Sequence, residues 1–311
     1  MGEQHARARI FRQRKGPIMA AFKKIGFIGT GVMGGRMCRN LAAKIGVPVI
    51  AFDADMDKVA ALDNAGIAAA PSIKALVGDV DLVILCLPGE PQLRAVCLGD
   101  GGVVEHLRAG QTVIDMTTTT VDIERELAAA MTAKSVDFAD APIARGVSSA
   151  QDGTLSIMVG ATPELFARIE PVLACMGTDV THCGGVGTGQ VVKLMNNMIV
   201  FMNVSALAEA LAIGRRAGVD GELLFETLSR GSADSFVLRK HGMQYMVKGD
   251  FPDDVFPVTY SIKDMSYALQ LAQQHGVDAA GARLADQRLR EAEAAGYGKL
   301  YCPVMYKLLD P

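Results

Sequence analysis

The sequence predicts an α/β fold of the Rossmann type, a doubly wound parallel sheet, followed by an all-α C-terminal domain joined by a long helix. Short apolar runs alternate with helical patterns from residue 23 onward, which is typical of consecutive βαβ units. A glycine-rich turn separates the first of these runs from the helix that follows it. After Gly189 the strand patterns stop and only helical patterns continue. Two domains are therefore expected, in line with the length of 311 residues.

Each expected strand is a short apolar run that ends in turn residues. The run 81–87 is apolar after its first residue, as expected of a parallel strand covered on both faces. Gly46 and Gly66 can end two of the helices, and Asp55 can begin one. The expected strands are 24–28, 47–53, 81–87, 112–116, 136–139 and 155–159. The expected helices are 32–45, 56–65, 121–134, one that begins at 162–165, and then 190–217, 221–229, 236–247, 257–274 and 282–295.

Composition excludes several classes of protein. The 31 basic and 34 acidic residues give a net charge of −3, which does not indicate a nucleic-acid-binding protein. The six cysteines include no Cys-x-x-Cys pair and indicate reduced thiols in the cytoplasm. His182-Cys183 lacks a suitably spaced third ligand, so no metal is expected. Residues 194–213 are apolar but are interrupted by asparagines and a glutamate, which favours a core helix over a membrane span.

The first eighteen residues hold five basic residues against one acidic one, a net charge of +4. A targeting segment is one interpretation, but the stretch contains no serine and few apolar residues. A disordered basic leader, or an upstream start before Met19, is the interpretation that we favour. The expected division of the chain is a leader at 1–19, an α/β domain at 20–186 and a helical domain, expected to support oligomerisation, at 187–311.

The glycine-rich turn has the pattern Gly29-Thr-Gly31-Val-Met-Gly34, which follows an expected strand and begins an expected helix. In this context the first glycine permits a tight turn, the second lets a pyrophosphate approach the backbone, and the third lets the helix pack closely on the strand. Asp53 ends the second expected strand, where a carboxylate binds the ribose hydroxyls of NAD and repels the 2′-phosphate of NADP. NAD is therefore expected, with NADP as the less favoured cofactor, unless Asp53 is only a turn residue.

Ile25–Gly34 resembles the corresponding segment of the β-hydroxyacid dehydrogenase family, which includes 3-hydroxyisobutyrate dehydrogenase. Other motifs of this family follow in order. Residues 140–146 with 153–160 resemble its substrate-binding segment, 185–197 its catalytic segment, and Lys263-Asp264 its C-terminal Lys-Asp motif. The resemblance covers residues 23 to about 300, and four motifs in order make it specific.

Lys193 stands near the start of the long helix in an apolar run, where an unpaired ammonium group would be costly. Helical spacing places Asn196 and Asn197 beside it, and burial or the helix N-terminus would lower its pKa. The resemblance implies that Lys193 is the general acid and base and that Asn197 orients it and the substrate; a surface lysine is the alternative. By resemblance, the substrate-binding residues are Ala144, Arg145, Gly146 and Asn196. The cofactor-binding residues expected from the motif and the resemblance are Gly29, Gly31, Val32, Met33, Gly34, Asp53, Leu87, Pro88, Thr118 and Lys263.

The substrate segment departs from the family pattern. The family has Ser-Gly-Gly where this chain has Ala144-Arg145-Gly146, so a hydroxyl group is lost and a guanidinium group is gained. Because a guanidinium fork suits a carboxylate, sulfonate or phosphonate, Arg145 is expected to bind the acidic group of the substrate. This resembles the arginine variant of sulfolactaldehyde and 4-hydroxybutyrate-type relatives. The alternative is a structural ion pair with Asp140 or Asp152.

The function expected from these residues is hydride transfer between NAD and a small 3-hydroxy acid of the 3-hydroxyisobutyrate type. One alternative is reduction of a small acidic aldehyde, such as succinic semialdehyde, tartronate semialdehyde or sulfolactaldehyde, at the same site. Imine reduction is disfavoured because Lys193 is present, and a dinucleotide-binding interaction protein is the alternative outside enzymes. The expected partner is a small anionic hydroxy acid or aldehyde, without nucleic acid or membrane, and the expected assembly is a homodimer or homotetramer.

Overall fold

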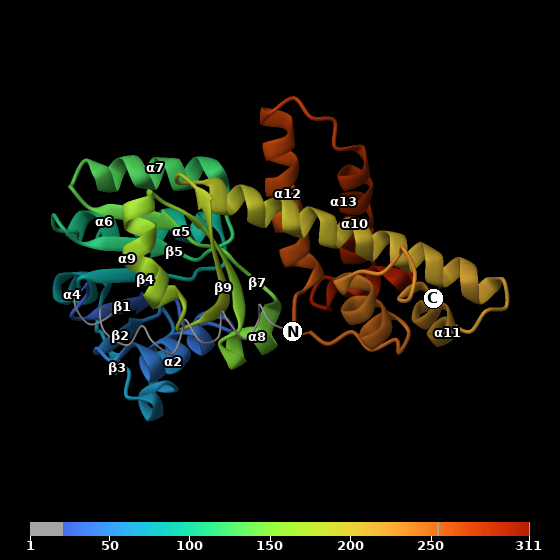
Figure 1. The fold of residues 1–311 in the computed structure, drawn as a ribbon, viewed down its shortest axis with the longest axis horizontal. Coiled ribbons are helices and arrows are strands. Elements are labelled where there is room, and N and C mark those ends of the chain that lie inside the picture. Colours follow the sequence, from blue (N-terminus) through green and yellow to red (C-terminus); the bar gives the residue numbers. More distant parts are fainter. Residues whose placement is uncertain (1–20, 254, 311) are drawn as a thin grey trace, which may run out of the picture. The chain divides into compact units, whose positions relative to one another are not determined.

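A computed structural model of the chain describes residues 21–253 and 255–310. The chain forms two compact units, with the division between Val191 and Val192. The first unit holds a sheet with helices on both faces and the second is helical, so the predicted fold class is confirmed (Figure 1). The leader expected at residues 1–19 lies outside the described residues.

The sheet of the first unit has the strand order β3-β2-β1-β4-β5-β6-β8-β7, and β9 pairs with β8. The pairs from β3 to β6 are all parallel, which is the doubly wound order that places a ligand site at the carboxyl ends of the strands. Strand β8 runs antiparallel to β6 and β7, so the sheet is parallel only in its larger part. The strands are β1 (Ile25–Ile28), β2 (Val49–Phe52), β3 (Ala68–Ala69), β4 (Leu82–Leu85), β5 (Thr112–Asp115), β6 (Asp137–Asp140), β7 (Ile143–Ala144), β8 (Leu155–Gly160) and β9 (Gly177–Gly184).

Alternate side chains of the central strands enter two different cores. Ile25 and Phe27 of β1 pack with the helices on one face, whereas Ile28 packs with those on the other. Helices α2 (Gly34–Ile45) and α9 (Pro163–Leu173) cover the first face. Helices α4 (Ile73–Asp79), α5 (Glu90–Leu98) and α7 (Val121–Thr132) cover the second. Burial on both faces explains why these strands are apolar throughout.

Several expected boundaries are corrected. The helix expected from residue 32 begins at Gly34, because residues 29–33 form the glycine turn. The helix expected at 56–65 is a short α3 (Met56–Ala60) followed by a 3₁₀ turn at Asp63–Ala65. The elements that were not expected are β3, β7, β9, α4, α5, α6 (Val103–His106), α8 (Gly146–Asp152) and a 3₁₀ helix at Cys302–Leu308.

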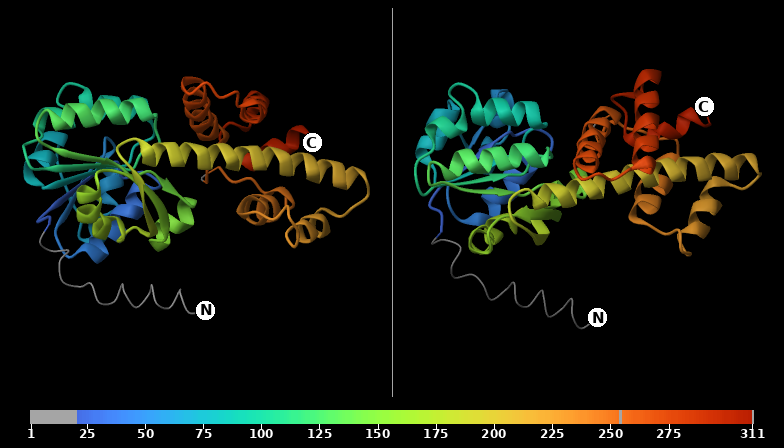
Figure 2. Two further views of the ribbon diagram at one scale, coloured as in Figure 1. Left: turned by 45° about the horizontal axis from the view of Figure 1, so that its top comes forward. Right: turned by 90° about the horizontal axis from the view of Figure 1, so that it is seen from above.

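The second unit is a set of helices around its own apolar core (Figure 2). Its helices are α10 (Thr188–Arg216), which begins in the first unit, α11 (Gly221–Leu228), a π-helix η3 (Leu238–Met246), α12 (Val258–Gln274), α13 (Ala280–Ala292), a π-helical turn η4 (Glu293–Tyr297) and a 3₁₀ helix η5 (Cys302–Leu308). Exposed apolar side chains that could support the expected self-association are Ile199, Ile213, Leu223, Phe236, Val277 and Leu284. The oligomeric state stays a prediction.

Helix α10 is the only helix among residues 21–253 and 255–310 that is long and apolar enough to cross a membrane by length and composition. A core helix passes the same test. Phe201, Val204, Ala208 and Leu211 of α10 are fully buried in the apolar core of the second unit. These contacts support the expected core helix.

Candidate functional site

The glycine turn connects β1 to α2 at the carboxyl edge of the sheet. Gly29 has φ +93°, and a Cβ atom there would lie 2.2 Å from the carbonyl oxygen of Cys86. A Cβ atom at Gly34 would lie 1.9 Å from the carbonyl oxygen of Gly29. A Cβ atom at Gly31 would meet no atom within 4 Å. The fold itself therefore requires the first and third glycines, whereas the second faces open space.

The open space beside Gly31 lies next to the first turn of α2. No side chain caps this helix at Met33, no acidic residue lies in its first turn, and Val32 is 54% exposed. A helix N-terminus with these features suits an anionic group such as a pyrophosphate. The turn therefore fits a dinucleotide.

Asp53 follows β2 and is held beside the glycine turn. Its Oδ2 accepts a hydrogen bond of 2.7 Å from the backbone N–H of Thr30, and its Oδ1 accepts one of 3.0 Å from Asp55 N–H. The carboxylate therefore acts as a turn residue, and the same contacts fix it next to the first strand, where a ribose would be bound.

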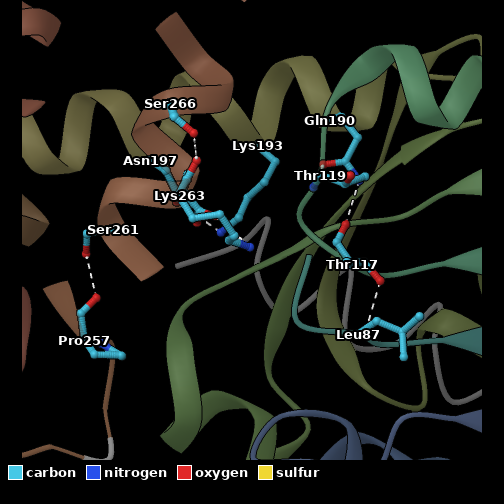
Figure 3. Close-up of polar contacts among 11 residues, drawn as sticks. Leu87, Thr117, Thr119, Gln190, Lys193, Asn197, Pro257, Ser261, Lys263 and Ser266 are labelled. Atoms are coloured by element: carbon cyan, nitrogen blue, oxygen red, sulfur yellow. Dashed lines mark hydrogen bonds and ion pairs between the residues drawn. The ribbon is translucent and has the colours of Figure 1, made fainter. Parts of the chain in front are cut away.

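The turns after β4 and β5 are joined to each other. The backbone N–H of Leu87 donates to Thr117 Oγ1 at 3.0 Å (Figure 3). Thr117 N–H in turn donates to Asp115 Oδ1 at 3.0 Å. Pro88 is exposed and Thr118 is partly exposed. These two turns and the glycine turn follow neighbouring parallel strands, so the structure brings these expected cofactor residues to one edge of the sheet.

Ala144 and Arg145 lie at the end of β7, and Gly146 begins α8. Both Arg145 and Gly146 have positive φ, +89° and +78°, a conformation that favours glycine. The Arg145 guanidinium pairs with Asp179 Oδ2 at 2.6 Å and donates from the same nitrogen to Thr154 O. Its partner is therefore neither Asp140 nor Asp152, the two acids weighed from the sequence.

Lys193, on α10, is 7% exposed, and its Nζ donates to Asn197 Oδ1 at 3.0 Å (Figure 3). The Nδ2 of Asn196 donates to the same oxygen at 3.0 Å. Asn197 Nδ2 donates to Asp264 Oδ2 at 2.6 Å, and Lys263 Nζ lies 3.1 Å from the other oxygen of that carboxylate. These partners fix the orientation of the Asn197 amide, with its oxygen toward Lys193.

Burial lowers the pKa of Lys193 from 10.5 to about 8. The negative charge of Asp264 opposes this shift and the positive charge of Lys263 adds to it, so that the value of about 8 is the balance of the three effects. At this pKa an amine exchanges its proton readily near neutral pH, which is what proton transfer to and from a substrate oxygen requires.

The sequence did not single out several buried polar residues that hold the site in place. Asp264 was recognised only as part of a motif, and its contact with Asn197 spans 67 positions. Asp140 accepts hydrogen bonds from the backbone N–H groups of Gly187 (2.6 Å) and Gln190 (2.9 Å) at the beginning of α10. Among the described residues no group of three His, Cys, Asp or Glu side chains is placed to hold a metal ion.

Two family models match the chain. The NAD binding domain of 6-phosphogluconate dehydrogenase matches residues 24–185, and the NAD-binding domain of NADP-dependent 3-hydroxyisobutyrate dehydrogenase matches residues 187–309. The 2-(hydroxymethyl)glutarate dehydrogenase of Eubacterium barkeri is 34% identical over 89% of this chain and 91% of its own length. The 2-hydroxy-3-oxopropionate reductase of Escherichia coli is 33% identical over 80% and 84%. A solved structure of Mycobacterium tuberculosis 3-hydroxyisobutyrate dehydrogenase with L-serine has a TM-score of 0.85 at 28% identity, and the match covers 93% of this chain and 99% of that one.

Proposed function

Because this chain belongs to the β-hydroxyacid dehydrogenase family, we propose that it transfers a hydride between NAD and a small 3-hydroxy acid of the 3-hydroxyisobutyrate type. Membership makes the chain an NAD(P)-dependent oxidoreductase that acts on the CH–OH group of small hydroxy acids. The observation that carries the finer proposal is the buried contact between Lys193 and Asn197.

In the oxidation direction, neutral Lys193 accepts the proton of the substrate hydroxyl through Nζ. The nicotinamide of a bound cofactor supplies the hydride acceptor. Asn197, held by Asp264, orients the amine, and its neighbour Asn196 donates to the same oxygen. In the reduction direction, protonated Lys193 returns the proton to the developing alkoxide. Lys193 is therefore the proposed catalytic residue, with Asn197 as its orienting partner.

The proposed residues of the cofactor site are the glycine turn with Asp53, the residues Leu87, Pro88 and Thr118, and Lys263. Asp53 supports NAD over NADP because a fixed carboxylate accepts from ribose hydroxyls and repels a 2′-phosphate. Of the two family models, one describes an NADP-dependent enzyme. The choice of cofactor is therefore part of the proposal.

A turnover screen with purified protein tests this function. The substrates are 3-hydroxyisobutyrate, 4-hydroxybutyrate, glycerate and sulfonated three-carbon alcohols, with the matching aldehydes, each with NAD and NADP. We expect kcat/KM to be at least about tenfold higher with NAD, a difference of about 1.4 kcal/mol. Replacing Asp53 by alanine should lower the ratio of kcat/KM with NAD to kcat/KM with NADP. NADH binding without turnover of any of these compounds would count against the proposed substrate class.

Reduction of a small acidic aldehyde is the second candidate, and the similarity to 2-hydroxy-3-oxopropionate reductase favours it. Both candidates use one site, and they differ in the direction in which the hydride and the proton at Lys193 are transferred. Comparing kcat/KM for each alcohol and its aldehyde distinguishes them.

We propose further that Arg145 binds the acidic group of the substrate. It is a surface residue paired with Asp179, and a pair with both side chains partly exposed is worth only about 0–1 kcal/mol. A substrate anion can therefore compete for the guanidinium. Only Nη1 is engaged among the hydrogen bonds and ion pairs of the described residues, which leaves Nη2 and Nε for a ligand.

The variant Arg145→Gly tests this role and suits the backbone, because glycine adopts φ +89° without strain. We expect KM for anionic substrates to rise roughly tenfold to hundredfold. This range corresponds to the loss of about 1.5–3 kcal/mol, the usual contribution of a hydrogen bond to a charged group. KM for neutral aldehydes should stay nearly constant. Asp179→Asn removes the competing charge and should lower KM for anionic substrates. Equal changes for charged and neutral substrates would show that Arg145 is structural.

A further inference from the structure

Three buried carboxyl side chains lie together in the first unit. Asp115 and Asp140 end the neighbouring strands β5 and β6 and are register partners. Glu124 lies on α7, the helix that follows β5, and its carboxyl group is within hydrogen-bonding reach of that of Asp115. All three side chains are fully buried. Such a cluster is costly unless protons or donors satisfy it.

The donors in this region leave two carboxyl oxygens unsatisfied. Asp140 accepts from two backbone N–H groups. Asp115 Oδ1 accepts from Thr117 N–H, and Glu124 Oε1 accepts from Gln190 Nε2 at 2.7 Å. Among the described residues, Asp115 Oδ2 and Glu124 Oε2 are buried with no hydrogen-bond donor. Because the two carboxyl groups are also in contact, one proton between them satisfies both oxygens.

No described lysine or arginine forms an ion pair with any of the three carboxyl groups. Burial raises the pKa of Glu124 well above its usual value, and it raises that of Asp115 to about 7 and that of Asp140 to about 6. The other titratable groups that face them are the thiols of Cys86, Cys97 and Cys183, which burial keeps neutral by raising the pKa of each.

We propose that Glu124 carries a proton at neutral pH and uses it to donate a hydrogen bond to Asp115. In this neutral form Glu124 fixes the side-chain amide of Gln190. Glu124 is then a positioning residue that acts through Gln190. The pair acts as one unit, and we call it the Asp115–Glu124 pair.

Gln190 transmits this arrangement to the turn after β5. Its Nε2 donates to Thr117 O at 2.6 Å as well as to Glu124, and its Oε1 accepts from Thr119 N–H at 3.2 Å (Figure 3). Thr117 also receives the N–H of Leu87. An ionised Glu124 would lose its donor role toward Asp115 and add a second buried negative charge. The turn would then lose the support that holds it in place.

The consequence for cofactor binding rests on the proposed function, in which Leu87 and Thr118 border the dinucleotide. The protonation of the Asp115–Glu124 pair does not rest on it. A carboxyl group whose pKa is raised by folding stabilises the folded state most at low pH, and this contribution is lost as the pH rises through the folded-state pKa. The thermal midpoint should therefore fall as the pH is raised above neutrality.

The variants Glu124→Gln and Glu124→Leu distinguish a requirement for the hydrogen bonds of the neutral acid from a requirement for side-chain packing alone. Glutamine accepts from Gln190 and donates to Asp115 as the neutral acid does, whereas leucine does neither. Glu126→Gln is the matched control, because Glu126 lies on the same helix, is exposed and pairs with Arg94. The measurements are the infrared carbonyl stretch of protonated carboxylic acids at neutral pH, the thermal midpoint from neutral to alkaline pH, and NADH affinity by fluorescence.

We expect the protonated carbonyl band in the wild type and in Glu126→Gln at equal intensity, and a clearly weaker band in Glu124→Gln, where only Asp115 and Asp140 can still contribute to it. Glu124→Gln should keep the thermal midpoint at neutral pH close to that of the wild type and the NADH affinity within about twofold. Its thermal midpoint should fall less than that of the wild type as the pH is raised. Glu124→Leu should lower the midpoint by at least about 4 °C, because it leaves buried polar groups unpaired, and should weaken NADH binding. A wild type without the band, or a Glu124→Gln protein as unstable as Glu124→Leu, would overturn the proposal. A wild type that does not bind NADH would refute the proposed function, while the band and the midpoints would still decide the protonation.

Discussion

Replacing Lys193 by methionine is expected to lower kcat by about 10²- to 10⁴-fold, the usual contribution of a general acid or base. Methionine keeps an unbranched apolar stem in the buried position and removes the amine. The thermal midpoint and the NADH affinity should stay close to those of the wild type. These two measurements separate a lost proton carrier from a disturbed fold, and a variant that keeps more than about a tenth of the wild-type kcat contradicts the assignment.

The pH dependence of the same reaction shows which protonation state of Lys193 each direction of the reaction requires. Oxidation needs the neutral amine, so kcat/KM should rise with pH to a plateau, with a midpoint near the Lys193 pKa of about 8. Reduction needs the protonated amine and should fall through the same range. Asp264→Asn removes the charge that raises this pKa, so the midpoint should move to lower pH. Lys263→Met removes a charge that lowers it, so the midpoint should move to higher pH.

The parts of the fold that could be predicted from the sequence are those whose signal is local. Strands such as β4 are buried on both faces and are apolar throughout, so a single run of residues identifies them. Strand β9 (Gly177–Gly184) has a mostly polar sequence and is largely exposed or half-buried, and β7 has only two residues. Their pairing with β8 depends on residues far away in the chain, which a local pattern does not contain.

The same division applies to the candidate site. The contact of Lys193 with Asn197 follows from helical spacing, and the structure places the two side chains in a hydrogen bond. The partner of Arg145 is 34 positions away and the partner of Asn197 is 67 positions away. Asp115 stands inside the expected strand 112–116 and gives no further signal in the sequence, because its raised pKa comes from burial by elements that lie elsewhere in the chain.

Replacing Gly31 by alanine is expected to abolish tight dinucleotide binding while leaving the fold intact. A Cβ atom at this position meets no protein atom within 4 Å, and the residue is not among those with positive φ, so alanine adds no strain. The added methyl group would occupy the space that the glycine pattern leaves for a pyrophosphate. NADH affinity should fall at least about tenfold, or about 1.4 kcal/mol, with an unchanged thermal midpoint.

Gly34→Ala provides the contrasting variant in the same turn. Its Cβ atom would lie 1.9 Å from the backbone oxygen of Gly29, so the turn must shift, and both the thermal midpoint and the NADH affinity should fall. Only Gly31 separates cofactor contact from folding, because the fold leaves the space beside it open. If Gly31→Ala binds NADH as tightly as the wild type, the pyrophosphate does not lie at this turn. The N-terminus of α2 would then not be the pyrophosphate site, and this conclusion would hold whether or not Lys193 is the catalytic residue.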